Sequence, residues 1–243
     1  QFLPQDNLSG FDENGGLCAA HSINRADDVP LIHWIIEFAK GDSFEYAGRT
    51  YVCPKANRFI ATYDPCNLVL KTDGNFVRYL QNHGFDYLIL SGYHNLTSAR
   101  NGVALARESM NNIKMWRQSC PQGIIHLELA STQDKNMRRV ILEEIAPLVD
   151  SVGLNDREAL DALEIVDEAM FLRMKDDNLS SAALFEILAR LKEALGVARI
   201  QLHFFGLYVT LQDKEFRISK EQNLQGMMLA ATVAASKALT GKI

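Results

Sequence analysis

Two glutamates of this 243-residue chain lie where strands are expected to end. Glu128 lies near the end of the apolar segment 124–129, and Glu158 follows a second short apolar segment that ends at Asn155. The residues between these segments, 135–149, have the apolar spacing of an amphipathic helix. Parallel strands joined by a helix place their carboxyl ends at one edge of the sheet, so both carboxylates are expected to face one cavity.

Carboxylates at such an edge favour phosphoryl transfer, because Mg2+ is commonly held by one or two carboxylates together with substrate phosphates and waters. Each residue also has a structural interpretation: Glu128 stands at a strand end by chance, and Glu158 begins the next helix, where an acidic residue suits the helix dipole. His126 lies two positions before Glu128 and therefore shares its strand face. It either orients Glu128 through a hydrogen bond or is a core histidine bonded to a backbone carbonyl.

A second polar group lies between expected strands. Arg58 could form a bidentate contact with a phosphate or carboxylate ligand, and Asp64 or Asn67 could bind sugar hydroxyls. Alternatively, Arg58 and Asp64 form a surface pair that contributes little. Neither a G-x-G-x-x-G nor a P-loop motif occurs, and there is no G-x-S-x-G or H-E-x-x-H, so the sites that these motifs mark are not indicated.

The composition and net charge indicate which partners are not expected. Thirty acidic against 25 basic residues give a formal net charge of -5 without any block of lysine or arginine, so nucleic acid is not an expected partner. Membrane association is not expected either, because no apolar run reaches the roughly 18 residues of a membrane-spanning helix and no signal peptide is recognisable. The widely spaced cysteines indicate reduced thiols in a cytoplasmic protein. They are Cys18, Cys53, Cys66 and Cys120.

The pattern of elements predicts two parts. Residues 1–63 are expected to form a lid-like, β-rich segment with a poorly readable N-terminus, and residues 64–243 an incomplete α/β core. Strands are expected over 31–38, 51–53, 58–61, 87–90, 124–129, 199–205 and 208–211. Helices are expected over 75–83, from Thr97 to 116, and over 135–149, 158–163, 166–174, 180–195 and 222–239. Strands separated by helices of this length predict a mostly parallel sheet flanked by helices on both faces.

Five motifs follow one another along the chain. They are IHWIIEF from Ile32, ANRFI from Ala56, LSGYH from Leu90, HLELAS from His126 and VGLNDRE from Val152. In order and approximate spacing this set resembles the ADP-dependent glucokinase and phosphofructokinase family, from about Leu31 to the C-terminus. The resemblance implies a ribokinase-like α/β fold with a smaller β-rich lid. It also implies transfer of the terminal phosphoryl group of ADP to a sugar hydroxyl, with Mg2+, leaving AMP.

The resemblance assigns roles by position. Glu128 and Glu158 would organise Mg2+ and its waters, with Asn155 beside the nucleotide. Residues 199–203, RIQLH, resemble the family strand R-I-H-F-H, so His203 is expected near the nucleotide, with Gln201 in place of the first histidine. The residues expected near the sugar are Glu37, Asn57 and Arg58.

One element of the family is missing. The catalytic aspartate of the family lies in a G-x-G-D loop near the C-terminus, and no such sequence occurs in this chain. General-base catalysis is worth roughly 10²- to 10⁴-fold in rate. We therefore expect this chain to be a fragment of a kinase and to be inactive alone.

Three functions remain open. The first is an ADP-dependent sugar kinase, with glucose favoured over fructose 6-phosphate because HLELAS and ANRFI are closer to the glucokinase branch. A phosphofructokinase would need additional cations, which Lys40, Lys55 or Arg58 could supply. The second is a non-catalytic, ligand-binding relative that lacks the catalytic aspartate. The third is an ATP-using sugar or nucleoside kinase of the same superfamily.

Overall fold

A five-stranded sheet forms the centre of the protein. The computed structural model describes residues 9–12, 14, 16–19, 32–63, 67–70, 72–175, 179–204 and 206–240. The strands are β7 (Tyr87–Leu90), β8 (Ile124–Glu128), β9 (Ser151–Leu154), β10 (Arg199–Phe204) and β11 (Leu207–Gln212). Their order is β11-β10-β9-β8-β7, in which only the β10–β11 pair is antiparallel. The expected mostly parallel sheet is confirmed, and the β10–β11 turn uses Gly206 at a φ of 77°.

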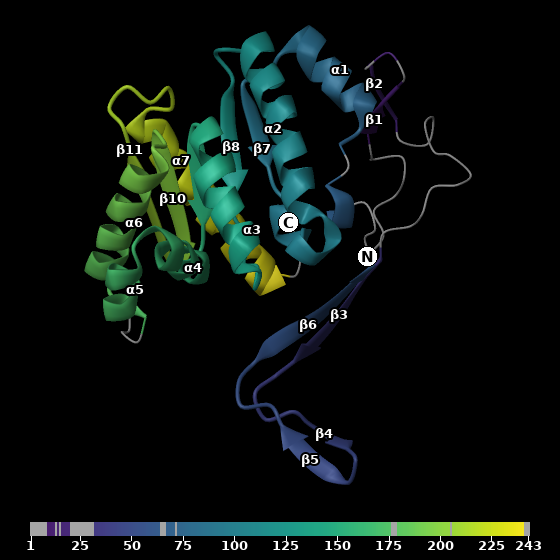
Figure 1. Ribbon diagram of the computed structural model, residues 1–243. Coiled ribbons are helices and arrows are strands. Elements are labelled where there is room, and N and C mark those ends of the chain that lie inside the picture. The colour runs from purple at the N-terminus through teal and green to yellow at the C-terminus, as the bar shows by residue number, and fades with distance from the viewer. Residues whose placement is uncertain are drawn as a thin grey trace.

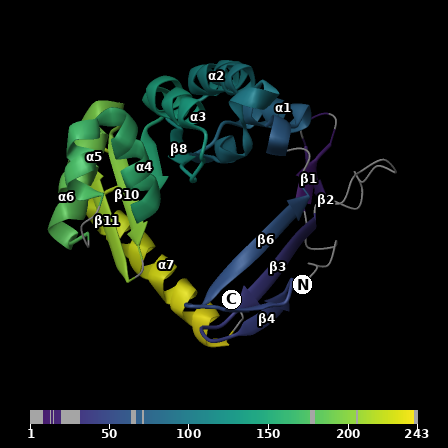
Figure 2. The ribbon, with the colours of Figure 1, turned by 60° about the horizontal axis from the view of Figure 1, so that its bottom comes forward.

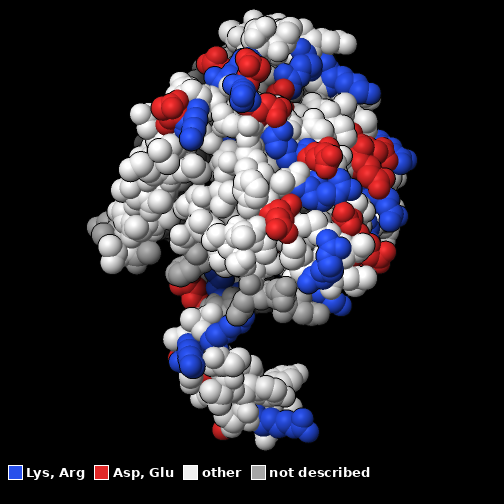
Figure 3. All heavy atoms as spheres, turned by 90° about the vertical axis from the view of Figure 1, so that its left-hand side faces the viewer, with Lys and Arg blue, Asp and Glu red and all other residues white. Residues whose placement is uncertain are grey.

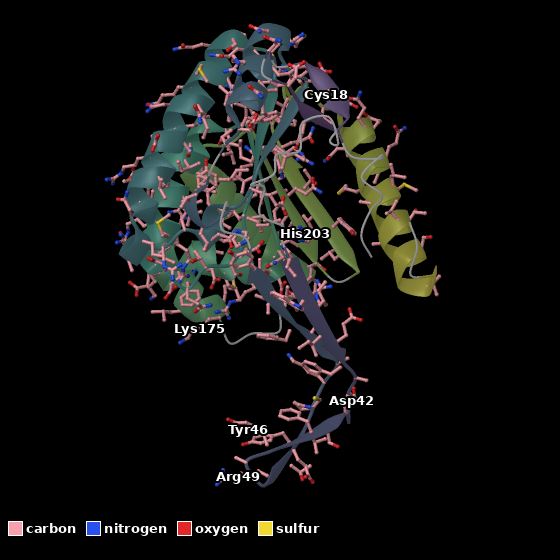
Figure 4. All side chains as sticks on the ribbon, turned by 90° about the vertical axis from the view of Figure 1, so that its right-hand side faces the viewer. Cys18, Asp42, Tyr46, Arg49, Lys175 and His203 are labelled. Atoms are coloured by element: carbon pink, nitrogen blue, oxygen red, sulfur yellow. The ribbon has the colours of Figure 1, made fainter. Side chains whose placement is uncertain are left out.

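Helices flank this sheet, but all except the last lie along one of its faces, so the expected helices covering both faces are not found among the described residues (Figures 1 and 4). The helices are α1 (Gly74–His83), α2 (Gly102–Ser119), α3 (Lys135–Val140), α4 (Asp156–Val166), α5 (Glu168–Met174), α6 (Ser181–Leu195) and α7 (Lys220–Thr240). Short 3-10 turns lie at Asn67–Val69, Tyr93–Asn95, Ser98–Arg100 and Ala146–Leu148, and a π-helical turn lies at Ile141–Ile145. α7 lies across the sheet from α1 and α2 (Figure 4).

The period of two along each strand separates the two faces of the sheet. One face is apolar and fully buried against the helices that connect the strands. Its side chains are Ile125, Leu127, Val152, Leu154, Ile200 and Leu202. The opposite face carries polar residues at intervening positions, namely His126, Ser151 and Arg199, all of them buried. The apolar face therefore stabilises the sheet through burial, and the polar face carries the side chains that could contact a ligand.

A long two-stranded ribbon projects from this body (Figures 1 and 2). β3 (Ile32–Phe38) pairs antiparallel with β6 (Asn57–Tyr63), and between them β4 (Ser43–Tyr46) pairs with β5 (Arg49–Val52). The β4–β5 turn places Ala47 and Gly48 at φ values of 52° and 72°, as two-residue hairpins prefer. A further hairpin joins β1 (Ser9–Phe11) to β2 (Leu17–Ala19).

Several helix boundaries differ from the sequence prediction. Thr97 begins only the 3-10 turn, and α2 starts at Gly102 because Asn101 adopts a left-handed φ of 61°. The Cβ of any larger residue at 102 would lie 2.6 Å from the carbonyl oxygen of Thr97. The helix expected from Val166 begins at Glu168, because Val166 belongs to α4 and the Asp167 carboxylate caps α5. The expected helix over 135–149 changes to π and 3-10 geometry before it ends around Pro147.

The ribbon and the sheet are consistent with the two expected parts, but the expected division at residues 63 and 64 lies beside residues 64–66, outside the described residues. It therefore stays a prediction. Strands β1, β2 and β4 were not predicted from the sequence. Within the described part of the chain, no helix is long and apolar enough to cross a membrane. On the face that includes α5 and α6, lysine and arginine are interspersed with aspartate and glutamate (Figure 3).

Candidate active site

The candidate site lies at the carboxyl end of the parallel strands. Glu128 ends β8, Asn155 follows β9, and His203 lies near the end of β10. The ribbon leaves the body on this side of the sheet, and His203 lies at the end of the sheet nearest the ribbon (Figure 4). The expectation that both acidic motifs close adjacent strands is confirmed, since β8 and β9 are paired in parallel.

Glu128 is held by the histidine that precedes it in the H-x-E motif. The Nε2 atom of His126 lies 3.1 Å from Glu128 Oε2, and its Nδ1 atom lies 2.8 Å from the hydroxyl oxygen of Ser151. His126 is 7% exposed. The expected hydrogen bond between the two side chains is therefore present, and no backbone carbonyl is needed to explain the buried imidazole.

Gly153 provides the space for this pair. It lies opposite Glu128 in the β8–β9 register. A Cβ atom at position 153 would lie 2.1 Å from Glu128 Oε2 and 2.7 Å from His126 Nε2. Glycine is thus required here by the close approach of side chains, because any other residue would displace the carboxylate.

Glu158 has a clear structural role. The backbone N–H of Asn155 donates to Glu158 Oε2 at 2.8 Å, and the N–H of Glu158 donates to Asn155 Oδ1 at 2.9 Å, which forms a capping box at the start of α4. Burial raises the pKa of Glu158, and the charge of Glu128 acts in the same direction. The helix-start interpretation is therefore confirmed, and Glu158 also lies close enough to Glu128 for their charges to interact.

His203 on β10 lies close to Glu128 on β8, across the carboxyl end of β9. Its Nδ1 atom lies 3.8 Å from Glu128 Oε1, and its side chain is 47% exposed. His203 is therefore accessible to a ligand, as a nucleotide contact requires. The alternation of β10 also points Arg199 and Gln201 to this face, and Gln201 accepts a hydrogen bond from Arg199.

The residues expected near the sugar are on the ribbon. Glu37 lies directly opposite Arg58 in the β3–β6 register, so both share one face of the ribbon, and both are exposed. Asn57 pairs with Phe38, and its side chain lies outside the described residues, as do Asp64 and the side chain of Asn67. The structure thus places Glu37 with Arg58 and leaves the remaining members of this cluster unplaced.

The side chains at this edge of the sheet could hold a metal ion together with a bound ligand. Among the described residues, no group of three or more histidine, cysteine, aspartate or glutamate side chains could hold a metal ion. Mg2+ does not require such a cage, since one or two carboxylates together with phosphate oxygens and waters suffice. Glu128 keeps Oε1 outside its hydrogen bond with His126, and that atom fits this mode of binding.

Sequence reasoning missed Ser151 and Gly153, and it treated Arg199 only as part of a resemblance. A signal for them exists, because polar or small residues alternate with apolar ones along β9 and β10. This alternation is expected for a sheet whose two faces differ. The contact between Ser151 and His126 depends on strand order and register, which periodicity does not supply.

The order of the strands and the parallel β7–β10 set are consistent with the ribokinase-like α/β fold that the resemblance implies. A family described as the ADP-specific phosphofructokinase/glucokinase conserved region matches residues 5–243. The chain belongs to this family. An ADP-dependent glucose/glucosamine kinase of Pyrococcus abyssi is 31% identical over 240 residues, which is 96% of this chain and 49% of the relative. An ADP-specific phosphofructokinase of Methanosarcina acetivorans is 26% identical over 87% of this chain and 45% of the relative.

Solved structures agree with this assignment. The last common ancestor of ADP-dependent phosphofructokinases from Methanosarcinales is 30% identical, with a TM-score of 0.79 over 100% of this chain and 52% of the other. An ADP-dependent kinase in complex with fructose-6-phosphate and ADPbetaS is also 30% identical, with a TM-score of 0.78 over 95% of this chain and 52% of the other. The chain thus spans about half the length of the relatives that it matches.

Proposed function

We propose that the full-length protein transfers the β-phosphoryl group of ADP to a hexose and releases AMP. The observation that carries this proposal is the His126–Glu128 pair, fixed at the carboxyl end of a parallel strand in a chain that the family matches over residues 5–243. An oriented carboxylate at this edge is suited to hold Mg2+ on a transferring phosphoryl group.

Each part of the site has a proposed task. Glu128 and Glu158 organise Mg2+ and its waters, and Mg2+ neutralises charge that develops on the phosphate oxygens. Asn155 and His203 contact the nucleotide. The residues that contact the sugar from the ribbon are Glu37, Asn57 and Arg58. The protein is also proposed to be cytoplasmic, because its four cysteines are widely spaced and form no C-x-x-C pair.

Glucose is the proposed acceptor, with fructose 6-phosphate as the alternative. The sequences HLELAS and ANRFI favour glucose, and the relative from Pyrococcus abyssi is named for glucose and glucosamine. Other relatives are named phosphofructokinases, and one solved relative holds fructose-6-phosphate. Lys40 and Lys55 are exposed on the ribbon and are available to a sugar phosphate.

Measuring AMP formation from ADP and Mg2+ tests the proposal in the full-length protein. We expect AMP to form with glucose more rapidly than with fructose 6-phosphate, and Glu128→Gln to reduce turnover by at least a hundredfold. Arg107→Gln is a matched control, since Arg107 lies on α2 in a surface pair with Glu144. Unchanged turnover in Glu128→Gln would contradict the proposed site. A rate with ATP equal to that with ADP would favour the ATP-using kinase.

The 243-residue chain by itself is proposed to be inactive, because it contains no G-x-G-D sequence. This feature also supports a second candidate function, a non-catalytic relative that binds nucleotide or sugar. Calorimetry of this chain with ADP and AMP, beside an assay of AMP formation, separates the two. Turnover by this chain would contradict its inactivity, and turnover by the full-length protein would exclude the non-catalytic candidate.

A further inference from the structure

A buried arginine without an acidic partner lies beneath the site. Arg199 is 5% exposed, and its guanidinium donates to Ser151 Oγ at 2.9 Å, to Asn223 Oδ1 at 2.8 Å and to Gln201. Its Nε atom has no hydrogen-bond partner, and among the described residues no carboxylate pairs with it. Burial lowers the pKa of Arg199. A buried cation with only neutral acceptors destabilises a fold, so its presence requires a reason.

The hydrogen bonds beyond Arg199 lead to Glu128. Ser151 is fully buried, and its hydroxyl oxygen accepts from Arg199 while lying 2.8 Å from His126 Nδ1. The other imidazole nitrogen lies 3.1 Å from Glu128 Oε2. Arg199, Ser151, His126 and Glu128 therefore form one continuous series across β10, β9 and β8.

The direction of the hydrogen bonds in this series follows from which groups can donate a proton and which can only accept one. An arginine only donates and an ionised carboxylate only accepts. Ser151 accepts from Arg199, and the phenol of Tyr87 also interacts with both of these side chains. A neutral imidazole that donates from Nε2 to Glu128 needs a donor at Nδ1, and the Ser151 hydroxyl can supply it. The imidazole then carries its own proton on Nε2 and donates it to Glu128. Every hydrogen bond of the series then runs from the buried cation toward the carboxylate.

We propose that Arg199 is a positioning residue that, through Ser151, holds His126 in the Nε2–H tautomer and so fixes the orientation of Glu128. Glu128 Oε2 is then occupied by the imidazole, and Oε1 is directed to the side of the edge where His203 lies 3.8 Å away. Outer partners of this kind set the orientation and basicity of a metal ligand. The inference deepens the proposed function, on which the role of Oε1 toward Mg2+ rests.

Gly153 completes the arrangement, since the two side chains occupy the space that its Cβ would fill. The orientation of Glu128 therefore depends on the hydrogen bonds that begin at Arg199 and on the space that Gly153 leaves open on β9. A catalytic contact of Arg199 with ligand is not implied, because its side chain is buried beneath the strand ends.

Long-range ¹H–¹⁵N spectra of the imidazole rings test the inference in the ¹⁵N-labelled chain without metal or nucleotide. His126→Gln identifies the resonances of His126. We expect the neutral Nε2–H tautomer in the unmodified chain, and a shift toward a mixture of tautomers in Ser151→Ala and Arg199→Met. Arg199→Lys keeps a donor for Ser151 and is expected to preserve the Nε2–H tautomer.

Arg117→Met is the matched control, because Arg117 is a partly buried arginine that binds Asp150 and the carbonyl oxygen of Gly123 at the opposite end of the strands. Its spectrum should equal that of the unmodified chain. Amide spectra establish that each variant is folded, and if Arg199→Met is not folded, the smaller change Ser151→Ala decides. The Nδ1–H tautomer in the unmodified chain, or an unchanged tautomer in folded Ser151→Ala, would overturn the inference.

Mn2+ binding, followed by water proton relaxation in the presence of ADP, separates this inference from the proposed function. Glu128→Gln should remove the binding, and Ser151→Ala should weaken it by about 10- to 100-fold. If Glu128→Gln has no effect, the proposed metal role is wrong, and the tautomer alone decides the positioning role. If Glu128→Gln removes binding but folded Ser151→Ala and Arg199→Met bind as tightly as the unmodified chain, the positioning role is wrong.

Discussion

The carboxyl edge of the sheet and the β3–β6 ribbon both carry residues of the candidate site, but they hold them in opposite ways. At the edge, His126 is 7% exposed and bonded at both ring nitrogens. On the ribbon, Glu37 and Arg58 are exposed, and even the apolar Ile36 is 58% exposed. One region fixes its side chains by burial and hydrogen bonds, whereas the other presents them on an open strand pair.

This contrast indicates which side chains of the candidate site are held in a fixed orientation by the fold itself. The phosphate side of the proposed reaction needs atoms at fixed positions, because preorganised groups stabilise developing charge without reorganising. A projecting ribbon that binds the sugar can close over its ligand, as the lids of many enzymes do. We therefore expect substitutions at the edge to affect stability and chemistry together, and substitutions on the ribbon to affect sugar binding alone.

The largest loss of stability is expected for Leu127→Ala. Leu127 is 0% exposed on the apolar face of β8 and directly precedes Glu128. Truncation of a buried leucine leaves a cavity and costs about 2–5 kcal/mol. Urea unfolding of the 243-residue chain measures the change, with Ile36→Ala on the ribbon as the control, for which we expect about 0.5 kcal/mol or less. Equal losses at the two positions would remove the distinction between the regions.

An intermediate effect is expected for Gly153→Ala. The added Cβ would overlap Glu128 Oε2 and His126 Nε2, and overpacking of this kind costs about 1–3 kcal/mol. Gly226→Ala in α7 is the matched control, since nothing lies within 4 Å of its added Cβ and alanine favours a helix. Urea unfolding and turnover of the full-length protein are measured together. Full activity in Gly153→Ala would show that the close approach at the edge is dispensable.

The sequence predicted much of the fold and part of the site. The parallel sheet, most helices, the position of Glu128 at a strand end and that of Glu158 at the start of the next helix follow from periodicity and helix signals, which are local properties. The predicted end of the helix at residue 195 is likewise confirmed, since α6 ends at Leu195 and Gly196 follows it with a φ of 65°. The start of α2 was wrong because Asn101 adopts a left-handed conformation that its residue type permits but does not require.

The support of the site could not be predicted in the same way. Ser151, His126 and Arg199 are far apart in the chain and meet only through the order β10-β9-β8 and its register. A serine inside an apolar strand gives no local signal for the partner that it will contact. The two candidate roles of Glu158 also could not be separated, since a capping residue and a residue near Glu128 have the same sequence pattern.

A smaller, pH-dependent effect is expected at Asp134, which caps α3 in the body. Its carboxylate accepts from the backbone N–H groups of Ser98 at 2.7 Å and Met137 at 3.0 Å. The hydrogen bond from Ser98, followed by those from α3, lowers the pKa of Asp134. A depressed pKa contributes stability above the unfolded value of about 3.9, and this contribution is lost as the pH falls through the folded value.

Asp134→Ala should therefore destabilise the chain at pH 7 by about 0.5–2 kcal/mol, as loss of a helix cap does. The difference from the unmodified chain should narrow as the pH falls below about 4. Urea unfolding at a series of pH values measures it. A difference that stays constant down to pH 3 would mean that the lost packing of the side chain, and not its charge, accounts for the effect.

The smallest effect on stability, and the sharpest test of the ribbon, is expected for Glu37→Gln. Glu37 is exposed beside Arg58, so the free energy of unfolding should change by no more than about 0.5 kcal/mol. If Glu37 accepts a sugar hydroxyl, loss of this charged hydrogen bond should cost about 1.5–3 kcal/mol of binding, or roughly a 10- to 100-fold rise in the KM for sugar.

Glu45→Gln is the matched control, since Glu45 is an exposed glutamate opposite Thr50 in the outer hairpin of the same ribbon. It should leave both KM values unchanged in the full-length protein. The KM for ADP should not change in either variant, because the nucleotide is proposed to bind at the edge of the sheet. If Glu37→Gln instead raised the KM for ADP and sugar equally, the ribbon and the edge would act as one preorganised site, and the contrast between an open and a fixed region would be wrong.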